Sequence, residues 1–197
     1  MLAARPLAST LAAAALALSI SACGLTGGFG NEGPEHGTLD SISGPYINFP
    51  HDLTYQVQIS RFLNPSDLED QAYIKGLPPG TPPLAPGEQW FALFIRVANE
   101  TKQPHMSASS FRMIDTTGVV YRGTLLNPAA NDFAYVPQTL GPKAVIPASS
   151  STAAQGDIQG AEILFRTGRQ FFFNRPVALE ISTPQLPPFT KSVDLDI

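Results

Sequence analysis

The sequence predicts an all-β protein, an antiparallel sandwich of about seven to nine strands with a proline-rich insert and one long loop. Most apolar segments alternate with polar residues at a period of two, which is typical of strands. Helix signals are nearly absent, and the 19 prolines among 197 residues leave few stretches in which a long helix could form. These observations together favour short strands packed as two sheets.

The first expected strands are the most regular. Leu53, Tyr55, Val57 and Ile59 alternate with polar residues, which predicts a strand with one buried face. Residues 90–97 are apolar on both faces. A strand of this kind is expected to be central in its sheet or covered on its second face.

Later strands are separated by turn residues. Residues 111–115 and 119–123 flank Thr116-Thr117-Gly118, which predicts a hairpin whose glycine adopts a positive φ. Further strands are expected at residues 161–166, 170–173 and 177–181, followed by a last strand at residues 193–197.

Three segments depart from the strand pattern. Residues 65–73 have capping residues, early acids and no glycine, which predicts about one or two helical turns. Residues 76–87 contain five prolines and three glycines, which predicts a stiff polyproline-like segment. Residues 127–156 show little strand pattern, and loops of this length are often functional.

The alternating apolar residues define the expected core between the two sheets. Its members are Val57, Ile59, Phe91, Leu93, Ile95, Val97, Leu164, Phe165, Leu179 and Ile181.

The N-terminus has the pattern of an export signal. Arg5, the only charge in the first 31 residues, precedes an apolar run and the only cysteine, a pattern typical of signal peptides. Ile20-Ser21-Ala22-Cys23 resembles the bacterial lipobox, which implies cleavage before Cys23 and a lipid on its sulfur. The alternative is that Cys23 is a small residue beside an ordinary signal-peptidase site.

This pattern sets the expected domain organisation and location. We expect a lipoprotein signal peptide over residues 1–22, a lipidated cysteine with a glycine-rich tether over 23–37, and the sandwich over 38–197. The protein would then be attached by its lipid to the extracytoplasmic face of a bacterial membrane. With 12 basic and 16 acidic residues and no basic run, no nucleic-acid partner is expected.

Several short motifs resemble one family of exported domains. Residues 91–101, Phe-Ala-Leu-Phe-Ile-Arg-Val-Ala-Asn-Glu-Thr, resemble the strand ending in Asn of telokin-like, immunoglobulin-like domains in bacterial lipoproteins of largely unknown function. The later motifs of that family correspond to residues 111–115, 118–121 and 160–165, and the resemblance covers roughly residues 50–182. It implies an immunoglobulin-like sandwich and an exported location, and it carries no catalytic residues.

Catalytic and metal-binding patterns are weak. The sequence contains three histidines and no Gly-x-Ser-x-Gly motif, so neither an enzyme nor a cofactor is expected. His105 and Met106 are ligand types that copper prefers, which leaves an exported copper carrier or an envelope enzyme as the alternative function. The simpler interpretation of His105 is a solvated loop residue.

Three arginines, Arg96, Arg112 and Arg122, lie on expected strands. They either hold an anionic ligand from one sheet face or pair with acids on neighbouring strands. The candidate acids are Glu100, Asp115 and Glu162.

The sequence therefore favours a non-catalytic binding or accessory module of the cell envelope, whose partner is a protein or an envelope polymer. The two irregular segments supply the candidate partner-binding residues, because polyproline is already ordered and aromatic rings are effective anchors. These candidates are Pro78, Pro79, Pro82, Pro83, Phe133 and Tyr135. The alternative for the aromatic pair is that both rings cover an edge of the sandwich.

Overall fold

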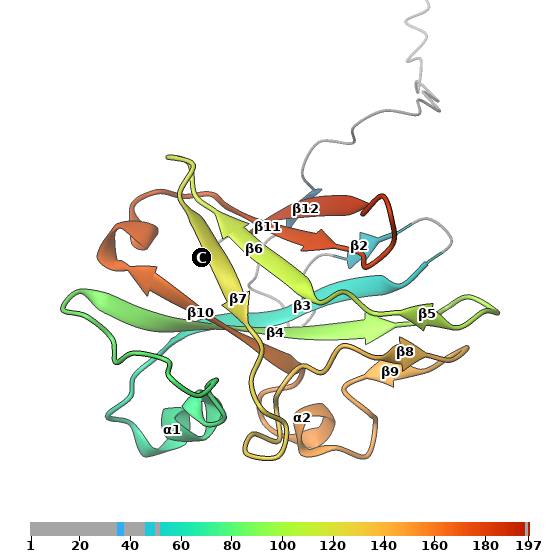
Figure 1. Cartoon of the computed structure of the whole chain (residues 1–197), viewed down its shortest axis with the longest axis horizontal. Helices are drawn as coiled ribbons and strands as arrows, with labels where there is room; N and C mark the ends of the chain where they lie inside the picture. The colour runs from blue at the N-terminus through green and yellow to red at the C-terminus, as the bar shows by residue number, and fades with distance from the viewer. Residues whose placement is uncertain (1–34, 38–45, 50–51, 196) are drawn as a thin grey trace, which may run out of the picture. The chain divides into compact units, whose positions relative to one another are not determined.

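The computed structural model describes residues 35–37, 46–49, 52–195 and 197, which belong to one compact unit (Figure 1). The expected signal peptide, the expected lipidation site Cys23 and most of the expected tether lie outside the described residues.

The main strands have the arrangement of an immunoglobulin domain. One sheet has the order β3-β4-β10-β7 and the other the order β6-β11-β12. Their bounds are β3 Thr54–Leu63, β4 Glu88–Ala98, β6 Ser110–Ile114, β7 Val120–Thr124, β10 Ala161–Gly168, β11 Val177–Ser182 and β12 Thr190–Leu195. Taken in chain order as strands A to G, they give the ABED and CFG sheets of the constant-type immunoglobulin fold. The expected fold class is therefore confirmed.

The two sheets are joined at one corner and extended at their edges. The hairpin β6–β7 pairs antiparallel, and β7 also pairs with β10, so hydrogen bonds run continuously from one sheet to the other. Short strands extend the main ones: β1 (Glu35–Gly37) on β12, β2 (Tyr46–Asn48) on β3, and β9 (Val145–Ile146) on β4. A separate pair is formed by β5 (His105–Met106) and β8 (Thr139–Leu140).

The helical elements are short. The expected helical turns over residues 65–73 are confirmed as α1 (Leu68–Ile74), whose N-cap Asp67 accepts a hydrogen bond from the Glu69 backbone. A second helix, α2 (Thr152–Gln155), lies within the long connection.

The expected strand over residues 170–173 is wrong, because a 3₁₀ turn, η1 (Arg169–Phe172), occupies this segment. Phe171 is fully buried, whereas the next two residues, Phe172 and Phe173, are exposed. A strand would bury alternate residues, but the tight turn allows Phe171 alone to enter the core.

The expected core is confirmed with one exception. Nine of its ten residues are at most 1% exposed, and eight of them lie in the cluster between the two sheets. Ile59 is 37% exposed. The register of β3 against β4 shifts between Val57 and Ile59, and a bulge of this kind moves the following side chain to the other face of the strand.

A second apolar cluster covers the outer face of β4 and β10. Trp90, Ala92, Phe94 and Leu164 are buried there, and β4 lies between β3 and β10, which confirms the expectation of a strand that is central in its sheet or covered on its second face. The cover comes from α1, the proline-rich segment and the long connection, which supply Tyr73, Ile74, Leu77, Leu84, Phe133, Ala134 and Ile158. Figure 1 shows α1 and α2 on the side of β4 and β10 that faces away from β6, β11 and β12.

Phe165→Ala should cost about 3–5 kcal/mol of unfolding free energy, because the ring is fully buried between the sheets and its removal leaves a cavity. The matched control, Ile59→Ala, should cost less than about 1 kcal/mol, as is usual for a partly exposed side chain. Urea unfolding of both variants measures the difference. Equal losses would contradict the assignment of Phe165 to the core and of Ile59 to the surface.

Candidate functional site

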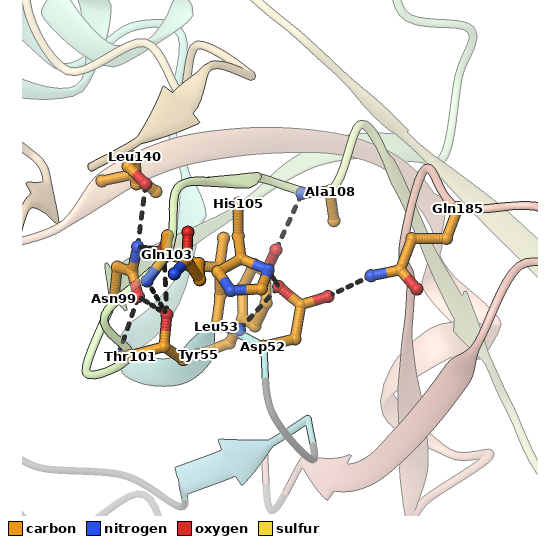
Figure 2. A network of polar contacts seen from close by, with 10 residues as sticks. All are labelled: Asp52, Leu53, Tyr55, Asn99, Thr101, Gln103, His105, Ala108, Leu140 and Gln185. Atoms are coloured by element: carbon orange, nitrogen blue, oxygen red, sulfur yellow. Dashed lines mark hydrogen bonds and ion pairs between the residues drawn. The ribbon is translucent and has the colours of Figure 1, made fainter. Parts of the chain in front are cut away.

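The motif residues behind the family resemblance close turns of the fold. Asn99, which ends β4, is 1% exposed. Its Oδ1 accepts hydrogen bonds from the backbone N–H and the hydroxyl of Thr101, at 2.9 and 2.8 Å. Its Nδ2 donates to the carbonyls of Gln103 and Leu140, both at 2.8 Å (Figure 2). All polar atoms of this amide are therefore used to end the strand and to hold β8.

The Asp115 side chain likewise closes a turn, the one between β6 and β7. Its carboxylate accepts hydrogen bonds from Thr117, Val119, Tyr121 and Asn174. Burial acts to raise the pKa of Asp115, but the hydrogen bonds, chiefly from Thr117 and Asn174, outweigh it and hold the pKa at about 2. The carboxylate therefore stays ionised and structural.

Gly160 is required by a close contact. It has a φ of +122°, and a Cβ at this position would lie 2.9 Å from the Phe94 carbonyl carbon. Any larger residue would push the long connection away from β4.

The proline-rich segment is fixed on one side and exposed on the other. Leu77 and Leu84 pack on the outer-face cluster. The Arg166 guanidinium, 5.2 Å from the centre of the Trp90 ring, donates to the carbonyl of Pro82. All four candidate prolines, Pro78, Pro79, Pro82 and Pro83, are exposed. Their role in partner binding stays a prediction.

The two candidate aromatic residues are not free surface anchors. Tyr135 is 1% exposed, its hydroxyl donates to the Ala108 carbonyl at 2.8 Å, and its ring packs edge-on against Phe111. Phe133 is half-buried against Tyr73 and Phe94. The expectation that Tyr135 offers its ring to a partner is therefore wrong, because the ring belongs to the core. Phe133 covers the outer face of β4.

His105 belongs to a polar network at the start of β3. Its Nδ1 lies 3.2 Å from Asp52 Oδ1, and Asp52 also accepts from the Leu53 backbone at 2.8 Å and from Gln185 Nε2 at 2.6 Å (Figure 2). Asp52 thus connects three segments. Met106 is exposed and accepts a contact from the Thr139 hydroxyl. No group of three or more His, Cys, Asp or Glu side chains suited to a metal ion occurs among the described residues.

Glu162 is buried with an incomplete set of partners. It is 0% exposed, its Oε2 accepts from Asn131 Nδ2 at 3.2 Å, and its Oε1 has no hydrogen-bond partner among the described residues. Burial raises the pKa of Glu162 to about 8 against the opposing hydrogen bond from Asn131. The carboxyl group is therefore largely protonated at neutral pH.

The expected pairing of arginines with these acids is wrong in part. Arg112 pairs with Glu180 on β11. Asp115 holds the hairpin, and Glu162 faces Asn131. Arg112 and Arg122 are paired positions of β6 and β7, whereas Arg96 lies on β4. The three arginines therefore do not share one sheet face.

Arg96 lies in an open groove of about 190 Å³ on the outer side of β4. Its guanidinium forms no ion pair or hydrogen bond with any residue that the structure describes. The groove is lined by Gln58, Arg96, Val145, Pro147, Ser149, Ala154, Gln159 and Gly160. Four of these residues lie in the long connection that the sequence marks as a candidate binding loop, and Gln159 and Gly160 follow it directly.

Sequence reasoning identified Arg96 but not the residues around it. The outer face of β4 is apolar at Trp90, Ala92 and Phe94 and becomes charged at Arg96. This change of character was the available signal. The side chains of residues 145–160 that line the groove show no such change in pattern, because only the folded chain brings them close to β4.

Within the described ranges, no helix is both long and apolar enough to cross a membrane.

Three solved structures are similar to this chain. A putative lipoprotein (ycdA) from Bacillus subtilis is 10% identical with a TM-score of 0.43, and the match covers 73% of this chain. The chain spans 37% of that protein. An uncharacterized β-sandwich protein from Clostridium difficile is 12% identical with a TM-score of 0.44, over 84% of this chain and 97% of that one.

The third structure, a functionally unknown protein from Listeria monocytogenes, is 10% identical with a TM-score of 0.49, over 77% of this chain and 81% of that one. No family model and no curated protein matches the sequence. The class of this protein, an immunoglobulin-like β-sandwich, therefore rests on its own strand topology.

Glu162→Gln should remove a pH dependence of stability. The folded pKa of about 8 lies above the usual glutamate pKa of 4.5, so unfolding releases a proton at pH values between these two. Stability of the wild type should therefore fall with rising pH in this window, by up to roughly 1.4 kcal/mol per pH unit.

Urea unfolding of the wild type and Glu162→Gln between pH 5 and pH 9 measures this slope. The variant keeps an amide that can still face Asn131, and it should be the more stable protein at the alkaline end. Parallel stability curves for the two proteins would contradict the assignment.

Proposed function

We propose that this protein is a lipid-anchored, non-catalytic binding module on the extracytoplasmic face of a bacterial membrane, whose partner is a protein or an envelope polymer. The location is supported by the lipobox-like Ile20–Cys23 segment at the end of an apolar run. The single observation that carries binding is the open groove that contains the unpaired Arg96.

The polar groups elsewhere in the domain support binding more than catalysis. The carboxylates of Asp52 and Asp115 and the amide of Asn99 are each saturated with hydrogen bonds that tie loops together. Arg96 differs, because it faces an accessible groove without a counter-charge. An arginine stays protonated in proteins and has only hydrogen-bond donors. Arg96 is therefore suited to bind an anion.

The proline-rich segment offers a second contact area for the same partner. Pro78, Pro79, Pro82 and Pro83 are exposed, while the leucines beside them and the Arg166 guanidinium hold the segment against the domain. A segment that is already ordered loses little conformational entropy when it binds.

The lipidation part of the proposal predicts that the full chain, expressed in a bacterium with radiolabelled palmitate, takes up the label, whereas Cys23→Ala does not. The reason is that Cys23 carries the only thiol in the sequence. Equal labelling of the two proteins, or none in the wild type, would refute lipidation.

The binding part predicts that cross-linking on intact cells captures partners with the wild type, and that Arg96→Gln loses some of them. Pro82→Ala/Pro83→Ala should lose partners that use the proline-rich segment. Arg122→Gln is the matched control, because Arg122 is an exposed strand arginine outside the groove. The same set of captured partners for all four proteins would show that neither surface binds.

A further inference from the structure

We infer that the Arg96 groove binds a terminal carboxylate that has an amide and a small alkyl group beside it, as at the C-terminal residue of a peptide. This inference rests on the proposed function, because it assigns a ligand class to the site through which that function would act.

The charge of the groove selects an anion. Arg96 is the only ionisable residue among those that line it, so the guanidinium meets no competing acid there. A planar guanidinium matches a carboxylate with two parallel hydrogen bonds. A phosphate dianion is usually held by several cations or by a row of backbone N–H groups, and the groove supplies one cation. A singly charged carboxylate therefore fits better.

The amide side chains of the groove supply the complement to an amide. Gln58 Nε2 donates to Gln56 Oε1 at 2.7 Å, which fixes the orientation of the Gln58 side chain. Gln58 Oε1 accepts no hydrogen bond from any described residue, so it is available to a ligand N–H. Gln159 adds an exposed amide at the rim. A ligand N–H next to the carboxylate would meet an acceptor here.

The remaining wall is apolar and limits the size of the ligand group. Val145, Pro147 and Ala154 contribute aliphatic surface. The volume of the groove is about 190 Å³. This is less than the ~300–1,000 Å³ of pockets that enclose a whole drug-sized molecule. The groove therefore accommodates an end group with a short alkyl side chain, while the rest of the ligand extends into solvent.

Both walls of the groove are fixed before a ligand arrives. Val145 pairs with Ala98 through β9 and β4, and the neighbouring Ile146 is buried. On the other side, the Gly160 backbone donates to the Ala153 carbonyl at 2.8 Å, and Ala153 is buried. A site that is already ordered binds without an entropic cost for loop closure.

The test uses the full chain in detergent micelles, with N-acetyl-alanine as the probe. Binding is followed by the ¹⁵N and ¹H shifts of the arginine Nε–H groups and by saturation transfer to the probe. N-acetyl-alanine should bind in the millimolar range and shift the Arg96 signal. Arg96→Gln should weaken binding by about tenfold or more, and Arg96→Lys should restore only part of it, because the two-point contact is lost. Arg122→Gln should bind as the wild type does.

Two comparison probes make the ligand class falsifiable. The N-methylamide of N-acetyl-alanine lacks the charge and should not bind, and inorganic phosphate should bind more weakly than the carboxylate. Equal binding of the methylamide, tighter binding of phosphate, or an unchanged affinity in a folded Arg96→Gln protein would overturn the inference. So would the absence of a shift at Arg96 in the wild type.

The outcome is separable from that of the proposed function. Lipidation and cellular capture do not enter the probe titration, so a failed palmitate experiment leaves the groove assignment intact. Conversely, capture on cells could depend on Arg96 while no carboxylate probe binds. That result would support the proposed binding module and reject the proposed class of ligand.

Discussion

The second apolar face of β4 is the constraint on which the rest of the structure depends. A strand of an ordinary sandwich faces the core on one side and water on the other, but Trp90, Ala92 and Phe94 make β4 apolar on its outer side as well. Leaving these side chains in water would cost several kcal/mol. Three segments therefore fold over this face: α1, the proline-rich segment and the first part of the long connection. This requirement explains why so many residues lie outside the sheets.

The candidate site begins where that cover ends. Arg96 lies on the same face of β4 as Phe94, two residues further along, and a charged group cannot be buried under an apolar cover without a partner. The long connection consequently leaves the outer face at this point: it pairs with β4 through β9, and after α2 Gly160 lies against Phe94. The space between these contacts is the groove. Its position thus follows from a change from apolar to charged along one strand face.

The sequence predicted the elements governed by local pattern and missed those governed by distant contacts. The alternation of apolar and polar residues predicts the main strands and nine of the ten core residues correctly. A period of two depends only on residues that are neighbours in the sequence. The bulge that exposes Ile59 and the turn that buries Phe171 depend on strand register and on packing, which no local pattern records. The burial of Tyr135 likewise depends on a distant partner, because the Ala108 carbonyl that its hydroxyl contacts is 27 residues away in the chain.

The long connection therefore has two parts with different tasks. Its first part is bonded to β10 almost as a strand would be. The Tyr135 backbone N–H donates to the Glu162 carbonyl at 2.9 Å, and the Glu162 backbone N–H donates to the Phe133 carbonyl at 2.6 Å. This cover excludes water from the Glu162 side chain beneath it, and the burial raises the pKa of its carboxyl group to about 8. The second part, which includes Val145, Pro147 and Ser149, pairs with β4 through β9 and leaves Arg96 accessible. Under the proposed function, the rigid cover on one side would fix the geometry of the open charged groove that presents Arg96 to a ligand on the other.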